Sequence, residues 1–160
     1  MVISVRRAAL AAAFGLGLPL AVAAEPHIVT HAVQGSFDDV RLDLETAIIN
    51  RGLVVDYEAF VGEMLKRTGA DVGSDVEIFS RAESFQFCSA VLSRRMMEAD
   101  PTNLGFCPHI VFAFERPGAE GTVHVGYRLL PETGSAETRA ALAAVNALMD
   151  EIVREAAGVK

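Results

Sequence analysis

The chain has 160 residues, a length that suits one domain, and combines 51% apolar residues with a formal net charge of −7. Its abundant Val, Leu, Ile and Phe argue against an intrinsically disordered protein, because such side chains can bury enough surface to offset chain entropy. The excess of acidic residues argues against a nucleic-acid partner, which is bound through Lys and Arg that neutralise phosphates.

The start of the chain has the pattern of an export signal. Arg6 and Arg7 form a short basic segment, an apolar run follows, and the small residues Ala23 and Ala24 supply a cleavage zone. The uncharged stretch is 17 residues long, whereas a helix needs roughly 20 to span a bilayer. We therefore expect cleavage, with a retained anchor as the alternative.

Residues 1–24 are accordingly predicted to be a signal peptide, and residues 25–160 a single α+β domain. Removing the signal takes away two arginines and no acidic residue, which leaves 12 basic and 21 acidic residues and a net charge of −9. We expect a periplasmic or secreted protein that has no contact with the membrane after cleavage.

The first elements of the domain are predicted to be a strand, a helix and a second strand. Residues 27–33 read as a strand, and Ser36, with Asp39 three residues later, is typical of a helix N-cap. Apolar residues at helical spacing continue until Gly52, which suits the position just after a helix end. Residues 53–61 alternate and predict a strand.

The middle of the domain is predicted to be shorter and more broken. Residues 64–73 predict one helical turn and a loop, and residues 75–80 a short strand. Residues 83–99 predict a helix, because their apolar side chains recur at helical spacing and Asp100-Pro101 then ends the pattern.

The last part of the chain predicts a hairpin and a long helix. Residues 106–115 are the most strand-like run, and Pro117 with two glycines then predicts a turn into a second strand at residues 122–128. Ser135 is expected to cap an amphipathic helix that Gly158 ends. This order of strands and helices predicts an α+β fold.

Alternation divides the predicted hairpin into two faces, if Glu115 pairs with Thr122. One face is apolar and is expected to pack in the core; it holds Phe106, Ile110, Phe112, Phe114, Val123, Val125 and Tyr127. The other mixes small and ionisable residues and gives the candidate ligand residues His109, His124, Gly126 and Arg128. A glycine leaves space there and the other three offer polar groups, so we predict a shallow ligand surface; a merely solvated sheet face is the alternative.

Metal-binding and catalytic residues are not assigned. His27 and His31 lie four residues apart on a predicted strand, which places them about 13 Å apart, too far to share one ion. The sequence contains no CxxC, HExxH or calcium-loop pattern, and no Gly-x-Ser-x-Gly elbow. We therefore expect neither a metal nor a cofactor.

Cys88 and Cys107 are the two cysteines of the chain, 19 positions apart. In an exported protein such a pair predicts a disulfide, worth about 3 kcal/mol in the chain-entropy model. Two alternatives stay open: a pair of separate thiols, and a redox or ligand-anchoring pair.

Two further stretches carry a resemblance. One begins at Ser36-Phe37-Asp38-Asp39 and ends at Gly52-Leu53-Val54-Val55. The other is a Pro-led aliphatic strand with a returning strand that contains a Tyr: Cys107-Pro108-His109-Ile110-Val111-Phe112-Ala113-Phe114-Glu115, then Gly121-Thr122-Val123-His124-Val125-Gly126-Tyr127. Over about residues 27–130 the chain resembles the bacterial domain-of-unknown-function 302 family. The resemblance implies a β-α-β(4)-α fold, in which a curved antiparallel sheet grips a helix, and a homodimer, but it implies no reaction.

The sequence thus predicts a binding or accessory module for a small or apolar ligand rather than an enzyme. The ligand is expected between the sheet and a helix, with a second copy of the chain as a further partner. One alternative is a thiol-based redox or detoxifying enzyme that uses Cys88 or Cys107, with His109 beside Cys107 on one strand face. The other is a structural interaction domain.

Overall fold

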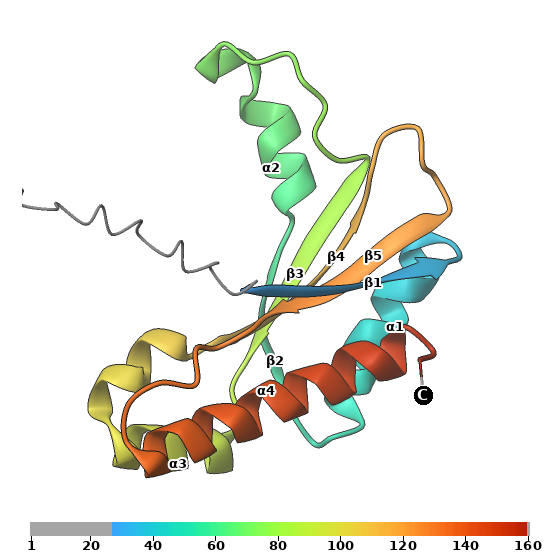
Figure 1. The fold of residues 1–160 in the computed structure, drawn as a ribbon. Coiled ribbons are helices and arrows are strands. Elements are labelled where there is room, and N and C mark those ends of the chain that lie inside the picture. Colours follow the sequence, from blue (N-terminus) through green and yellow to red (C-terminus); the bar gives the residue numbers. More distant parts are fainter. Residues whose placement is uncertain (1–26, 160) are drawn as a thin grey trace, which may run out of the picture.

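The computed structural model describes residues 27–159 (Figure 1). Its strands are β1 (Ile28–Gln34), β2 (Val55–Ala59), β3 (Arg81–Phe87), β4 (His109–Glu115) and β5 (Thr122–Arg128). Its helices are α1 (Phe37–Ile49), α2 (Val61–Thr68), α3 (Ala90–Ala99) and α4 (Ala136–Ala156), with short 3-10 turns at Ala70–Val72 and Pro101–Phe106. The predicted signal peptide, residues 1–24, lies outside the described residues.

The five strands form one antiparallel sheet in the order β1-β5-β4-β3-β2. Strand β1, helix α1, the four later strands and helix α4 follow one another in β-α-β(4)-α order, and α2 and α3 are inserted before and after β3. The predicted α+β fold, with its antiparallel sheet and long C-terminal helix, is therefore confirmed.

Helices α1 and α4 pack against each other and against one face of the sheet (Figure 1). Leu44 and Ile48 of α1, Met149 and Ile152 of α4, and Val125 of β5 are fully buried between these layers. Neither α1 nor α4 covers the other face, which we call the open face. Its side chains include Thr30, Ala32, Tyr57, Ala59, Ser84, Gln86, Phe112, Phe114, His124 and Gly126.

The predicted caps of the two core helices are confirmed. The Ser36 hydroxyl oxygen accepts a hydrogen bond from the Asp39 backbone N–H at 3.1 Å, and Ser135 caps α4 in the same way through Thr138 at 3.1 Å. Gly52 follows the end of α1 with φ +71°, a conformation that glycine adopts without strain. Local sequence therefore determines where both helices begin.

The helix predicted at residues 83–99 was wrong in its first part. Residues 81–87 are strand β3, and the helix begins only at Ala90, with Ser89 as its N-cap. Phe85 and Phe87 alternate with polar residues and point to the helix layer, where both are fully buried. Antiparallel pairing with β4 outweighs the helical spacing that the same residues display.

The strand predicted at residues 75–80 was also wrong. These residues form a loop that leads from the 3-10 turn after α2 into β3. Val76 and Ile78, whose alternation suggested a strand, remain 70% and 50% exposed. The loop and α2 project together beyond the end of the sheet (Figure 1).

Candidate functional site

The four candidate ligand residues do not share one face of the sheet. His124, Gly126 and Arg128 alternate on the open face of β5. His109 lies on the opposite, helix-facing side of β4, where it is fully buried. The prediction that all four form one ligand surface was therefore wrong for His109.

The cause is a one-residue shift in the register of the β4–β5 hairpin. Glu115 pairs with Val123 and not with Thr122. Its side chain also accepts a hydrogen bond from the Gly121 backbone N–H at 2.6 Å, which fixes the end of the turn. A shift of one residue turns every side chain of a strand to the other face.

The shift exchanges the expected core and surface residues of β4. Val111 and Ala113 are buried beneath the helices, whereas Phe112 and Phe114 lie on the open face and are only partly buried. Phenylalanine was predicted to be in the core because of its large apolar surface. Here the smaller side chains face the closely packed α1 and α4 layer instead.

Aromatic side chains fill the part of the open face where a ligand surface was expected. The rings of Phe114 and His124 stack with centroids 4.7 Å apart, and Phe79 packs on Phe114 at 5.4 Å. A Cβ added to Gly126 would meet the Phe112 ring at 2.7 Å and would also contact the Val29 carbonyl. Gly126 thus allows neighbouring groups to pack closely and leaves no hollow for a ligand.

His109 is the most deeply buried titratable group among the candidates. Its Nδ1–H donates to the Phe106 carbonyl at 3.2 Å, so in the neutral ring Nε2 is a bare acceptor, and it has no hydrogen-bond partner in the described structure. Burial lowers the pKa of His109 and the charge of Arg128 lowers it further, although the hydrogen bond with Phe106 acts in the opposite direction. The imidazole is therefore held neutral inside the core.

Cys88 and Cys107 form a disulfide, with their Cα atoms 6.4 Å apart. Cys88 directly follows β3 rather than lying inside a helix, and Cys107 comes two residues before β4. The neighbouring ladder pair is Phe87 with His109. The disulfide therefore links the two ends of the segment of residues 88–107, which connects β3 to β4 and contains α3.

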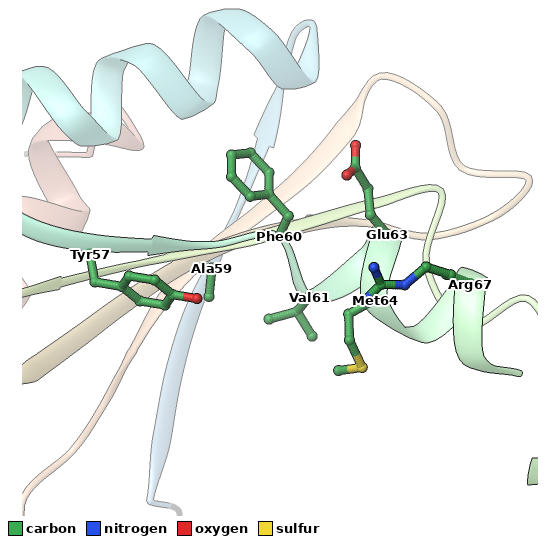
Figure 2. Close-up of a pocket in the computed structure, with 7 residues that line it drawn as sticks. All are labelled: Tyr57, Ala59, Phe60, Val61, Glu63, Met64 and Arg67. Carbon is green, nitrogen blue, oxygen red and sulfur yellow. The ribbon is translucent and has the colours of Figure 1, made fainter.

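A groove of about 640 Å³ opens where β2 passes into α2 (Figure 2). Its lining residues are Tyr57, Ala59, Phe60, Val61, Glu63, Met64 and Arg67. The large apolar side chains remain uncovered: Tyr57 is 59% exposed, Phe60 48% and Met64 43%. Because adjoining exposed apolar side chains on a protein surface commonly mark interaction sites, this groove is the candidate functional site.

The distribution of exposed apolar residues favours the same region. Of 13 large apolar residues exposed in residues 27–159, seven fall within residues 54–78: Val54, Tyr57, Phe60, Met64, Val72, Val76 and Ile78. A second hollow, of about 320 Å³, lies between α2 and the loop of residues 73–79. Helix α2 therefore stands between two hollows and has no fully buried residue.

A network of charged side chains positions the β2 wall of the groove. Arg41 of α1 donates hydrogen bonds to Glu58 of β2 and, at 2.9 Å, to Glu83 of β3. Burial would lower the pKa of Arg41, but these bonds raise it above its ordinary value, so the guanidinium stays charged. Glu58 is next to Tyr57, and the network therefore ties this part of β2 to α1.

Sequence reasoning missed the groove because it predicted one helical turn and a loop over residues 64–73. The available signal was the apolar spacing of Val61, Met64 and Leu65 directly after a strand, which is typical of a short amphipathic helix. Exposure could not be deduced from this spacing, since it depends on what the rest of the chain packs over α2.

Residues 27–159 contain neither a membrane-spanning helix nor a cluster of metal ligands. No helix there combines the length and hydropathy that crossing a membrane requires. In the same part of the chain, His, Cys, Asp and Glu side chains do not gather in threes in a way that could hold a metal ion.

The comparisons with known proteins agree with this fold. The family model described as domain of unknown function DUF302 matches residues 29–156. The chain belongs to the DUF302 family. Among curated proteins, none matches it.

A solved structure supports the architecture of this DUF302 domain. The crystal structure of an uncharacterized conserved DUF302 protein from Bacillus stearothermophilus superposes with a TM-score of 0.66 at 16% sequence identity. The match covers 81% of this chain and 98% of the other. At this identity the similarity establishes the fold and assigns no ligand.

Proposed function

We propose that this DUF302 domain is an exported binding module that takes a small apolar ligand in the groove between β2 and α2. The observation that carries the proposal is the exposure of Tyr57 and Met64 on one side of a groove of about 640 Å³. Small-molecule sites are concave and mostly apolar, with volumes of about 300–1,000 Å³. The groove, rather than the face of β5, is the place where a ligand finds uncovered surface.

Binding of the uncharged dye phenylnaphthylamine tests this proposal. We expect its fluorescence to rise with the wild-type protein, and the double substitution Tyr57→Ala and Met64→Ala to weaken binding about tenfold, since two apolar walls are lost. A matched control is Val91→Ala with Leu104→Ala, because these apolar residues are also exposed but lie on α3 and in the 3-10 turn after it. Equal loss in both variants, or no dye binding, would contradict the proposal.

Export belongs to the same proposal, with residues 1–24 as the signal and residues 25–160 as the mature domain. The disulfide supports it, because such bonds persist in oxidising compartments and are rare in the cytosol. We propose the periplasm or the exterior of the cell as the place where the ligand is met.

We also propose that a second copy of the chain pairs along β1. Strand β1 lies at one edge of the sheet, has seven residues with no charge and no proline, and pairs with β5 without a bulge. The other edge, β2, contains Asp56 and Glu58 and has a register shift after Val55. Charges and bulges protect edge strands from pairing with another chain, so β1 is the edge at which we expect a partner strand to pair.

The backbone of β1 shows which groups such a partner would meet. Leu129 N donates to the His27 carbonyl, and Gly35 N donates to the Gly121 carbonyl. Odd-numbered residues of β1 therefore bond to β5, and the alternation of an antiparallel ladder turns the N–H and C=O groups of even-numbered residues outward.

A two-fold axis at His31 makes this edge self-complementary. All seven residues of β1 then pair, and Val29 lies opposite Val33 of the second copy, a favourable β-branched pair. His31 itself has a buried Nε2 that makes no hydrogen bond in the described structure.

Substitution of Ala32 tests the dimer. Ala32→Pro removes one outward N–H and leaves the ladder to β5 intact, so we expect a folded monomer by light scattering after gel filtration. Ala32→Val keeps the N–H and should stay dimeric. A monomeric wild-type protein, or a dimeric Ala32→Pro variant, would refute pairing through β1.

The thiol-based alternative has less support. His109 is buried on the helix-facing side and its Nδ1–H is engaged by the Phe106 carbonyl. The group near the Cys107 sulfur is instead the Ser93 hydroxyl, at 3.8 Å. We therefore favour the binding module over a redox enzyme.

A further inference from the structure

We propose that the groove takes a single-chain amphiphilic anion, a long-chain carboxylate whose tail lies against Tyr57 and Met64 and whose carboxylate meets Arg67. This inference rests on the proposed function and adds the chemical class of the ligand. It is carried by the placement of charged and hydrogen-bonding groups around the apolar walls.

The apolar walls fit a flexible hydrocarbon tail. Tyr57 and Ala59 come from the open face of β2, and Val61 and Met64 from the first turn of α2 (Figure 2). Methionine adapts its shape to irregular partners, and the tyrosine ring offers a flat apolar surface. A tail along these residues would cover side chains that water now reaches.

Arg67 is a cation without a partner at this groove. In the described structure it forms no ion pair, not even with Glu63 one helical turn earlier. By contrast, Arg41, Arg51 and Arg81 all bind carboxylates of their own chain. In Figure 2 the Arg67 side chain extends back along α2 toward β2, so its guanidinium is available to a ligand in the groove.

On the tail-binding side, the Arg67 guanidinium only donates hydrogen bonds, and the Tyr57 hydroxyl can donate one to an anion. Figure 2 shows the Tyr57 hydroxyl pointing toward Val61, on the side of the chain where Met64 also lies. The Glu63 carboxylate lies on the other side, with Phe60. A ligand against Tyr57 and Met64 therefore meets groups that can donate hydrogen bonds rather than a carboxylate, which favours an anion over a cation.

The ligand is inferred to be a free acid and not the surface of a membrane. Residues 25–160 carry a net charge of −9, from 12 basic and 21 acidic residues, and an anionic lipid surface repels a protein of that charge. One guanidinium suits one carboxylate, and the groove of about 640 Å³ has the size of a small-molecule site.

The test compares three probes with the same tail: dodecanoate, dodecanol and dodecyltrimethylammonium, each titrated calorimetrically as monomers into the full domain. We expect dodecanoate to bind about tenfold more tightly than the other two, in keeping with one charge-assisted contact. Arg67→Met should remove this preference and leave dodecanol binding unchanged. Glu63→Gln should keep it, and Arg95→Met, which removes an exposed charge from α3, is the matched control.

The outcomes separate the inference from the proposed function. Equal binding of the three probes, preference for the ammonium, or an unchanged Arg67→Met variant would overturn the anion and leave the apolar groove standing. Failure of all three probes to bind would overturn both. Binding to anionic phospholipid vesicles but not to dodecanoate would also overturn the free acid, in favour of a membrane surface.

Discussion

His109 shows how a single buried residue links this fold to pH. Its imidazole is fully buried, donates through Nδ1–H to the Phe106 carbonyl and packs edge-on against Phe87 with centroids 5.8 Å apart. No carboxylate of the described structure contacts it. Protonation would therefore place an uncompensated charge in the core.

We predict that stability falls as the pH drops below the ordinary histidine pKa of 6.5. The folded-state pKa of His109 lies below that value, so the unfolded chain binds the proton first and is favoured as the pH falls, until the folded pKa is passed. Denaturant unfolding at about pH 8 and about pH 5.5 measures the change. His109→Leu should show a smaller difference between the two conditions.

The exposed His27 provides the control for this experiment. A His27→Gln variant should keep the wild-type difference in unfolding free energy. If His109→Leu also kept it, the acid sensitivity would have to come from other groups.

Gly126 is a second residue whose role is steric. An added methyl group would contact the Val29 carbonyl and meet the Thr30 methyl group at 2.8 Å. We predict that Gly126→Ala lowers the free energy of unfolding by about 1–3 kcal/mol, as overpacking does. Gly105→Ala has open space around the new methyl group and should change it little; a similar loss in both variants would contradict the steric account.

At the scale of elements, the disulfide joins the two ends of the segment that contains α3 and the 3-10 turn after it. Helix α3 buries only Met96 fully, Leu92 and Met97 pack partly buried against the core, and the Asn103 side chain donates to the Met96 carbonyl at 2.9 Å. The disulfide therefore adds a covalent link between the two ends of this segment to the contacts that α3 makes with the core.

We predict that the double substitution Cys88→Ala with Cys107→Ala lowers the free energy of unfolding by about 3 kcal/mol. The reason is the loop of 19 positions that the bridge closes in the unfolded chain. Denaturant unfolding with and without a reductant checks it: the reductant should destabilise the wild type and leave the double variant unchanged. Free thiols in the oxidised wild-type protein would contradict the prediction.

The same scale shows what the sequence could and could not predict. Capping residues such as Ser36 and Ser135 act locally, and the hairpin and the long terminal helix are visible in patterns that need no distant partner. The register at Glu115 and the strand at residues 81–87 depend on partners elsewhere in the chain. They were accordingly predicted wrongly.

The candidate site was harder to predict than the fold. Cys88 and Cys107 were paired correctly because their number and the expected compartment leave few choices. The groove at Tyr57 and Met64 is defined by what fails to cover these side chains. No local sequence pattern shows that other side chains fail to pack over these two residues.

At the scale of the whole molecule, the proposed export predicts the mass of the mature protein. Expression of the full chain in a bacterium should yield a periplasmic protein that begins at Ala24 or Glu25, measured by intact mass spectrometry. Replacing Arg6 and Arg7 by Glu should keep the uncleaved chain in the cytoplasm, since the basic segment directs insertion. A wild-type protein of full-length mass would contradict the signal peptide.

The position of β1 in the sheet affects when this strand can pair during synthesis of the chain. β1 pairs with β5, and even the closest partners, Gln34 and Thr122, lie 88 positions apart. A nascent chain that stops short of β5 lacks the neighbour that β1 needs, and such distant closure slows folding. If the chain is exported as proposed, β1 has no partner strand until β5 has been made, which suits passage through a secretion channel.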